Sequence, residues 1–143
     1  MKRFSALVIG LVFLIGFGAT TFAYDICIVL QDADAFLGDM TLNFDISDPT
    51  KSGHYELHGL GVDSRGNNIN FSGTGNKMAE FYFFNISGSN KNQYGKLNTY
   101  TYTTNLEEGK TEGDYVGVVT IHTDSGTSET DPNGSLTVIS CGE

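Results

Sequence analysis

The sequence contains no tryptophan, only two prolines and two cysteines, and only eight basic side chains against 17 acidic ones in 143 residues. The formal net charge is therefore −9 at pH 7. Nucleic-acid binding needs clustered Lys and Arg to replace phosphate counterions, so we expect no nucleic-acid partner. The same charge disfavours adsorption to anionic lipid surfaces. The length suits one domain and is too short for a multidomain enzyme.

Signatures of catalysis and of helices are also missing. The chain has no G-x-S-x-G or H-E-x-x-H motif, and no Gly-rich loop opens a helix. Beyond residue 23, no stretch keeps a helical apolar period for the about 11 residues that indicate a helix. Only residues 31–38 and 105–110 are compatible with a helical turn. We therefore expect an all-β protein without a cofactor. Its function is expected to be binding in preference to catalysis.

The first 23 residues have the pattern of a targeting segment. Two basic residues precede an uncharged apolar run, residues 4–18, and the more polar ATTFA follows and ends at Ala23. This order is typical of a secretory signal peptide (1–23), although residues 4–23 are also long enough for an uncleaved membrane anchor. Cleavage after Ala23 leaves a single domain, residues 24–143, which contains six basic and 17 acidic side chains. We expect this domain to be secreted or periplasmic, with no stable membrane anchor.

The two cysteines lie near the two ends of this domain. In an oxidising compartment, Cys27 and Cys141 are expected to form a disulfide, with two free thiols or an intermolecular bridge as the alternatives. A disulfide requires Cα atoms within roughly 7 Å, so the first and last strands would be neighbours. The absence of C-x-x-C excludes a redox motif, and two cysteines without nearby paired histidines do not form the usual zinc site.

Period-two alternation of apolar residues recurs along the domain, in runs bounded by Gly, Asn, Asp or Ser. Thr, Tyr, Phe, Val and Ile dominate these runs, as expected for a half-buried pleated surface. The connections DSRG (63–66), GNK (75–77), EEG (107–109) and DPNG (131–134) have turn chemistry and are too short for parallel crossovers. The predicted strands span residues 25–31, 39–46, 54–62, 67–75, 79–87, 95–104, 114–123 and 134–141.

A meander of about eight strands whose ends are covalently joined predicts a closed antiparallel up-and-down barrel, because closure removes exposed sheet edges. A Greek-key β-sandwich has similar strand spacing and is the alternative. The layout is similar to that of the lipocalins, but their G-x-W signature requires a tryptophan. It also resembles, in layout only, the dirigent and allene-oxide-cyclase barrels. No motif carries a residue over from any of these families.

Glycines interrupt one face of two predicted strands. In residues 54–62, Tyr55 and Leu57 share their parity with Gly59 and Gly61, and residues 67–75 repeat this arrangement. Glycine weakens a strand unless it provides a bend or a close approach. These glycines are therefore expected to allow coiling of the barrel, or alternatively to leave room for a ligand in its lumen.

Catalytic and metal sites have weak support. Two histidines, His54 and His58, lie about 13 Å apart at i, i+4 in a strand, which is too far to share a metal. Either one, or His122, would need a carboxylate partner to act as an acid or base. The carboxylates within residues 32–39 lack the Gly and Glu positions of a helix-flanked calcium loop. We expect no metal site and no catalytic residues.

The expected ligand site is a mainly apolar cavity in the middle strands. Tyr82, Tyr100 and Tyr102 are predicted to form its polar-tipped walls, with His58 near one mouth. The sequence does not decide which face of residues 79–87 and 95–104 is interior. A barrel binding a small apolar or amphipathic molecule is therefore the first hypothesis for function.

Two other function classes follow from particular residues. A structural or interaction protein of the cell envelope, or a homo-oligomer, would explain strands that are apolar on both faces, such as AEFYFF and YVGVV. A barrel enzyme using a His–carboxylate pair is the third class.

Overall fold

The computed structural model describes residues 24–47 and 53–141, so the predicted signal peptide lies outside the described residues. These residues form an all-β domain, and no helix among them is long or apolar enough to cross a membrane. Its strands are β1 (Ile26–Leu30), β2 (Met40–Ile46), β3 (His54–Val62), β4 (Asn68–Met78), β5 (Phe81–Lys91), β6 (Leu97–Glu107), β7 (Glu112–Thr123), β8 (Gly126–Thr130) and β9 (Asn133–Ile139).

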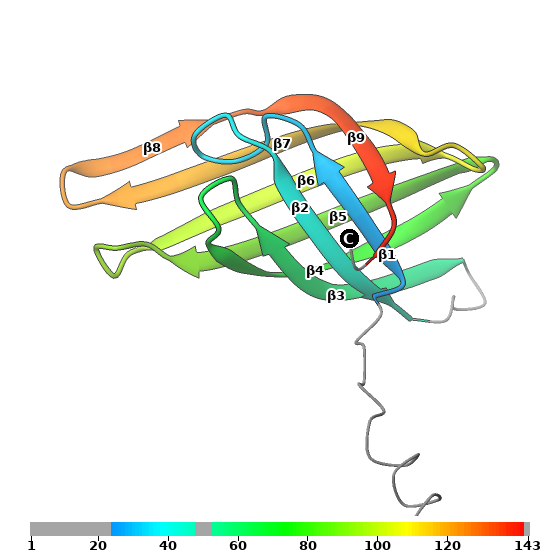
Figure 1. The fold of residues 1–143 in the computed structure, drawn as a ribbon, viewed down its shortest axis with the longest axis horizontal. Helices are drawn as coiled ribbons and strands as arrows, with labels where there is room; N and C mark the ends of the chain where they lie inside the picture. The colour runs from blue at the N-terminus through cyan, green and yellow to red at the C-terminus, as the bar shows by residue number, and fades with distance from the viewer. Residues whose placement is uncertain (1–23, 48–52, 142–143) are drawn as a thin grey trace, which may run out of the picture.

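The strands close into an antiparallel barrel of eight strands with one extra strand, as the alternation predicts (Figure 1). Each strand from β1 to β7 pairs with the next, and β9 pairs with both β7 and β1. The extra strand, β8, continues the same side of β7 beyond β9, so that the β7–β8 hairpin extends one end of the barrel. The barrel, and not the Greek-key sandwich, is the fold.

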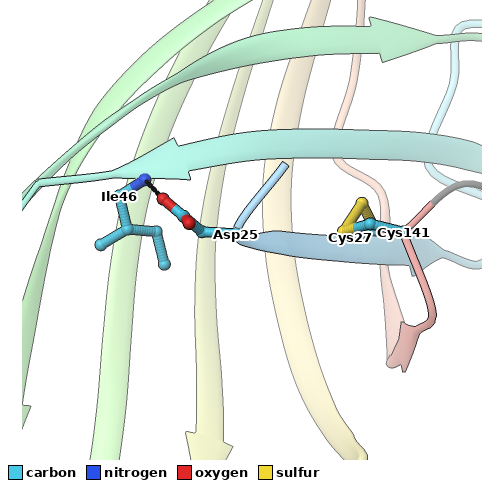
Figure 2. The surroundings of a disulfide bond; sticks show 4 residues. All are labelled: Asp25, Cys27, Ile46 and Cys141. Carbon is cyan, nitrogen blue, oxygen red and sulfur yellow. Dashed lines mark hydrogen bonds between the residues drawn. A yellow bond between two sulfur atoms is a disulfide. The ribbon is translucent and has the colours of Figure 1, made fainter. Parts of the chain in front are cut away.

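A disulfide joins Cys27 to Cys141, with Cα atoms 5.2 Å apart (Figure 2). It lies where β1 and β9 close the barrel, and Cys27 is paired in register with Ile139. Next to it, the backbone N–H of Ile46 donates a hydrogen bond of 2.7 Å to the Asp25 carboxylate, which fixes the start of β1 to the end of β2. The predicted covalent link between the first and last strands is confirmed.

Side chains fill the middle of the lumen. The Phe71 ring lies at the centre of an aromatic cluster, with ring centroids 6.5 Å from Phe44, 6.2 Å from Tyr100 and 6.1 Å from Tyr102. Aliphatic side chains from the other strands complete this core, and its members are almost fully buried. Because a close-packed interior leaves few voids larger than a water molecule, the middle of this barrel is a core. The space at mid-height between the strands is therefore filled by side chains.

The glycines that face the lumen have two physical roles. A Cβ at Gly59 or Gly73 would lie 1.9 or 2.2 Å from a backbone oxygen of the neighbouring strand, so these residues permit the close approach of coiled strands. A Cβ at Gly61 or Gly88 would lie 2.4 or 2.5 Å from the Phe71 ring. The space that these two glycines leave is therefore occupied by an aromatic ring of the protein.

Two of the predicted turns differ from the structure. Residues 75–77 were expected to form a turn, but β4 continues through them, and Gly75 pairs with Phe84 and Lys77 with Tyr82. The turn lies at Ala79, which has a φ of 54°, a conformation that alanine rarely adopts. The predicted turn at 131–134 also does not form a hairpin, because β8 and β9 follow one another along the same strand, β7.

The outer wall carries apolar side chains where strands are apolar on both faces. Tyr115 and Val119 of β7 point into the lumen and are buried, while Val116 and Val118 between them are 59% and 40% exposed. Phe83 of β5 is half-buried beside a shallow hollow of about 170 Å³ that Val116 also borders. The outer wall is thus partly apolar over β5–β7.

Candidate functional site

The two ends of the barrel differ in chemistry. One end of the barrel carries the β1–β2, β3–β4, β5–β6 and β7–β8 connections, and we call it the polar end (left in Figure 1). We call the opposite end the apolar end (right in Figure 1). Each end holds a pocket above the packed middle of the lumen.

Three connections at the polar end share one five-residue turn, which we call the capped turn: residues 34–38 (DAFLG), 63–67 (DSRGN) and 92–96 (NQYGK). In each turn, a side-chain oxygen of the first residue accepts hydrogen bonds from the backbone N–H groups of the third and fifth residues, with N–O distances of 2.7–3.1 Å. The fourth residue has a φ between 58° and 80°. Asp and Asn suit the first position because their short side chains bond their own backbone, and Gly suits a positive φ. The turns are therefore rigid loops defined by local chemistry.

Asp34 links the first capped turn to the second. Its carboxylate accepts two further hydrogen bonds, from the N–H of Ser64 at 2.9 Å and from the Ser64 hydroxyl, and the residue is only 1% exposed. Burial alone would raise the pKa of this carboxyl, but the hydrogen bonds from Ser64, Gly38 and Phe36 outweigh burial and hold the pKa below its ordinary value. Both carboxylate oxygens of Asp34 therefore accept hydrogen bonds from the protein itself, and the charged side chain has a structural role.

Two tyrosine hydroxyls hold the β1–β2 connection over the lumen. The Tyr102 hydroxyl donates a hydrogen bond of 2.7 Å to the carbonyl of Ala33, and the Tyr115 hydroxyl donates to the carbonyl of Gln31. Ala33 is fully buried against the core as a result. Burial raises the pKa of Tyr102 and raises that of Tyr115 to about 12, so both phenols are neutral donors at physiological pH.

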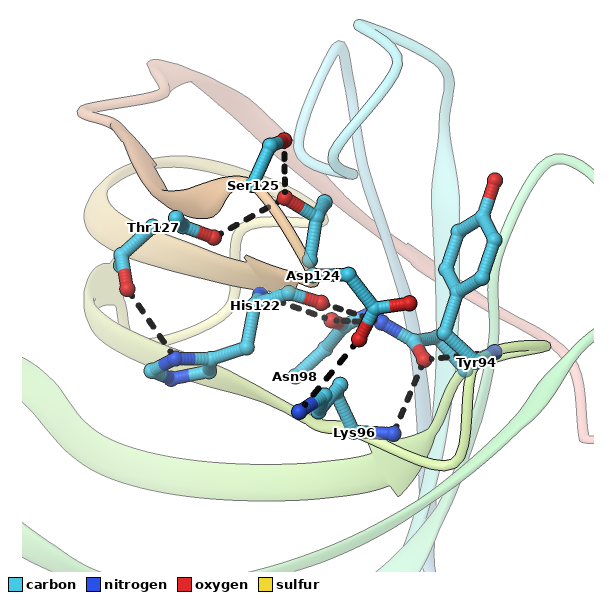
Figure 3. Close-up of polar contacts among 10 residues, drawn as sticks. Tyr94, Lys96, Asn98, His122, Asp124, Ser125 and Thr127 are labelled. Carbon is cyan, nitrogen blue, oxygen red and sulfur yellow. Dashed lines mark hydrogen bonds and ion pairs between the residues drawn. The ribbon is translucent and has the colours of Figure 1, made fainter.

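The third capped turn is tied to the β7–β8 hairpin by the Asn92 side chain and by the contact between Lys96 and Asp124, which Figure 3 shows. The Asn92 amide donates to the Asn98 side-chain oxygen at 3.1 Å and to the His122 carbonyl at 2.7 Å. The Lys96 ammonium lies 3.4 Å from the Asp124 carboxylate, which joins the two hairpin tips. All hydrogen-bonding groups of the Asn92 side chain are used within the protein.

The polar pocket lies between these turns and has a volume of about 310 Å³. The third residues of the three capped turns, Phe36, Arg65 and Tyr94, stand at its rim. Asn90, Asn98 and Tyr100 of β5 and β6 lie deeper, and Tyr100 is almost fully buried. Burial raises the pKa of Tyr100, and its contacts with the amides of Asn98 and Asn90 offset this only in part. Amide and hydroxyl groups therefore dominate the inner part of this pocket.

The apolar pocket at the other end has a volume of about 340 Å³. Its lining comes from lumen-facing positions on six strands and is almost entirely apolar: Ile26, Ile46, Tyr55, Tyr82, Phe84, Leu106 and Val138, with Asp25 as the charged member. The rings of Tyr82 and Phe84 are parallel, with centroids 6.3 Å apart, and form one wall. Pockets of this character and size are typical of small-molecule sites, whose volumes run from roughly 300 to 1,000 Å³.

Polar groups gather at the rim of the apolar pocket. The Lys77 ammonium forms an ion pair of 2.6 Å with Glu108 and lies 5.2 Å from the centre of the Tyr82 ring. The hydrogen bond to Glu108 raises the pKa of Lys77 and lowers that of Glu108, so both are charged near neutral pH. The Tyr82 hydroxyl lies 3.4 Å from the same carboxylate. An apolar interior with a charged rim is thus the geometry of this end.

The structure does not bring the four predicted site residues into one cavity. Tyr82 lines the apolar pocket, Tyr100 lies in the polar pocket, and Tyr102 belongs to the packed core between them. His58 lies on the outer wall, because Leu57 faces the lumen and side chains alternate along β3, so His58 does not line either pocket. A ligand-binding role for the tyrosines stays a prediction.

Histidine–carboxylate chemistry has no lumenal site among the described residues. His54 and His58 are exposed on the outer wall, and the His122 ring lies 3.3 Å from the Thr127 hydroxyl on the β7–β8 hairpin (Figure 3). No group of three or more His, Cys, Asp or Glu side chains in residues 24–47 and 53–141 is arranged to hold a metal ion.

Sequence reasoning did not identify the capped turns or the pocket that they surround. The available signal was the spacing, since the first residues of the turns, Asp34, Asp63 and Asn92, follow one another at intervals of 29 residues.

Comparison with protein-family models, with curated proteins and with solved structures finds no match for this chain.

Proposed function

We propose that this protein is a secreted or periplasmic, non-enzymatic β-barrel that binds a small apolar or amphipathic molecule in its apolar pocket. The observation that carries the proposal is the apolar pocket itself, a concave space of about 340 Å³ at the mouth of a closed barrel. Its lining offers aliphatic and aromatic surface that gains free energy when a ligand removes it from water.

The disulfide supports the proposed compartment. The bond between Cys27 and Cys141 is compatible with an oxidising extracellular or periplasmic location, where structural disulfides persist. Together with the predicted signal peptide, it supports a protein that meets its ligand outside the cytoplasm.

The rim supports an amphipathic occupant. A molecule whose apolar part contacts Phe84 and Leu106 would keep its polar end near Asp25 and the Lys77–Glu108 pair. Such an arrangement leaves the charged rim hydrated, which avoids the cost of burying charge. The Tyr82 side chain fits this position because its ring is apolar and its hydroxyl lies at the wet edge.

The test is a titration of the mature protein with N-phenyl-1-naphthylamine, a neutral apolar fluorophore whose emission rises on transfer from water. We expect saturable binding by the wild-type protein. Val138→Trp fills the apolar pocket and should weaken binding by at least about tenfold, a change of about 1.4 kcal/mol. Val118→Trp makes the same substitution on the outer wall and should leave binding unchanged.

Fluorescence is excited where tryptophan does not absorb, and circular dichroism checks that each variant is folded. Failure of the wild-type protein to bind the probe would contradict the proposal. Equal binding by the folded Val138→Trp and wild-type proteins would contradict it as well, because the probe would then sit elsewhere.

The second candidate is a structural or interaction protein of the cell envelope, and the observation that favours it is the apolar outer wall. Val116 and Val118 project from the wall that also carries the shallow hollow beside Phe83, so one surface offers both parts of a contact between two copies. Native mass spectrometry of protein from its own source measures co-purified ligand and oligomeric state together. A ligand-free dimer that Val118→Asp dissociates would favour this candidate over the first.

A further inference from the structure

The polar pocket has the features of a second binding site, at the opposite end of the barrel from the apolar pocket. We infer that it binds a neutral saccharide, with one sugar ring placed between the three capped turns. The inference is independent of the proposed function, because no residue lines both pockets.

The first argument is a buried oxygen without a partner. The side-chain oxygen of Asn90 is inaccessible to solvent and has no hydrogen-bond partner among the described residues. Leaving a buried acceptor unsatisfied costs about 1–3 kcal/mol, so a rotation of the Asn90 side chain that brings this oxygen to a donor in the pocket would be favoured. Asn90 lines the polar pocket beside Asn98 and Tyr100.

The second argument is the chemistry of the lining. Side-chain amides and a phenol both donate and accept hydrogen bonds, and they approach the pocket from the β3–β4 turn (Asn67), from β5 (Asn90) and from β6 (Asn98 and Tyr100). A ligand that matches them carries groups on several sides that also both donate and accept. Hydroxyl groups around a sugar ring meet this requirement, whereas a nucleobase presents polar groups only along its edges.

The third argument is the rim. Phe36, Arg65 and Tyr94 occupy equivalent positions in the three capped turns, and the Arg65 guanidinium carbon lies 3.2 Å from the centre of the Phe36 ring. This contact occupies Arg65 with Phe36 and leaves Tyr94, which is 57% exposed, as the open aromatic face. One open ring offers an apolar surface for the C–H face of a sugar, and adenosine serves as the competing planar ligand in the test.

The fourth argument is rigidity, together with the uncharged groups of the inner lining. Side-chain oxygens of Asp34, Asp63 and Asn92 fix the turns that carry the rim, so little ordering is needed on binding. The lining carries Arg65 and Lys91 against Asp63, while the chain as a whole has a net charge of −9, so charge does not select an anion or a cation here. The uncharged amide and hydroxyl groups of the inner lining match a neutral ring with hydroxyl groups, and inorganic phosphate serves as the competing anion in the test.

The test uses nuclear magnetic resonance of the side-chain amides of the mature protein. The probes are methyl β-D-glucoside, D-galactose, D-mannose and N-acetyl-D-glucosamine, each at concentrations up to the order of 10 mM. We expect at least one of them to shift the side-chain amide signals of Asn90 and Asn98 with saturation. Adenosine and inorganic phosphate, tested in the same way, should leave these signals unchanged.

Two variants separate binding from folding. Asn90→Leu replaces the amide with an apolar group of similar shape and should weaken saccharide binding at least about tenfold. It removes an unsatisfied oxygen together with the amide's contact with Tyr100, so circular dichroism checks that the variant is folded. Thr104→Val is the matched control: it removes another buried, unpartnered oxygen from β6 at a position that does not line the polar pocket. Saccharide binding by this variant should equal that of the wild type.

Three results would overturn the inference. The first is the absence of a shift with all four saccharides, and the second is undiminished saccharide binding by the folded Asn90→Leu variant. The third is a shift of the same signals by adenosine or phosphate in place of the saccharides. Binding of N-phenyl-1-naphthylamine at the other end is measured separately, so either proposal can fail without the other.

Discussion

The two ends of this barrel are closed by different kinds of interaction. At the polar end, side-chain oxygens cap three turns, Asp34 joins two of them, and the Tyr102 and Tyr115 hydroxyls hold the β1–β2 connection. At the apolar end, the side chains around the pocket make mainly apolar contacts, and the Cys27–Cys141 disulfide secures the seam between the first and last strands. Directional polar contacts thus define one end, and burial with a covalent link defines the other.

The two ends differ in how strictly contacts fix the geometry of their side chains and loops. Hydrogen bonds to buried carboxylates and carbonyls require defined geometry, so they hold the polar end in one arrangement. Apolar contacts are non-directional, so they define the side-chain arrangement at the apolar end less strictly. Experiments that remove one kind of interaction should therefore affect one end more than the other.

Removal of the disulfide should have the largest effect. The bond closes a loop with a sequence separation of 114 residues, for which chain entropy predicts a loss of stability on the order of 4–5 kcal/mol in a Cys27→Ala/Cys141→Ala variant. Urea unfolding followed by circular dichroism measures this loss. Hydrogen exchange should show lost protection in β1 and β9, while amides of the capped turn 63–67 keep theirs. Equal loss at both ends would show that the ends are not separately stabilised.

Asp34→Asn should have the next largest effect. An asparagine at this position can still cap its own turn, as Asn92 does, but its NH₂ group would face the N–H and hydroxyl donors of Ser64. Loss of hydrogen bonds to a charged acceptor should lower the free energy of unfolding by about 1.5–3 kcal/mol. Asp63→Asn is the control, because only a bond within its own turn, from the side chain of Asn67, is at risk. Its loss should be smaller than that of Asp34→Asn.

The same pair of variants has a pH dependence of defined sign. The folded-state pKa of Asp34 is lower than its ordinary value of 3.8, so its stabilising contribution is complete above that value and disappears as the pH falls through the folded pKa. The difference in unfolding free energy between wild type and Asp34→Asn should therefore shrink in acid. A difference that stays constant down to the lowest pH at which the protein folds would contradict this assignment.

The sequence predicts the barrel well because closure depends on patterns that it displays. Alternation in residues 40–46 identifies Met40, Leu42 and Phe44 as the buried face, and the two cysteines indicate which strands meet. The same method misses β8, whose five residues, GTSET, contain no apolar side chain and are mostly exposed. It also ends β5 too early, because Ser89, Asn90 and Lys91 continue the strand without apolar alternation.

The sites are harder to predict because they depend on which side chains fill the lumen. Tyr100 and Tyr102 have the same parity and the same residue type, yet one reaches a pocket and the other donates to Ala33. That difference arises from the β1–β2 connection, which is 69 residues away from Tyr102 in the sequence. The inner amides of the polar pocket are likewise brought together only by the register of β5 and β6, which pairs Asn90 with Asn98.

A pair of Tyr→Phe substitutions gives the smallest and sharpest comparison of the two ends. The Tyr102 hydroxyl is buried and donates to a buried carbonyl at 2.7 Å, so Tyr102→Phe leaves that acceptor unsatisfied and should cost about 1–2 kcal/mol. The Tyr82 hydroxyl makes an exposed contact of 3.4 Å with Glu108, so Tyr82→Phe should change stability by less than about 0.5 kcal/mol. Both substitutions keep the ring, and urea unfolding measures both on the same scale. Hydrogen exchange should then show faster opening of residues 31–39 in Tyr102→Phe alone, because that hydroxyl holds the β1–β2 connection over the core. If the two variants lose equal stability, polar contacts do not distinguish the ends, and the fixed arrangement attributed to the polar end would lose its physical basis.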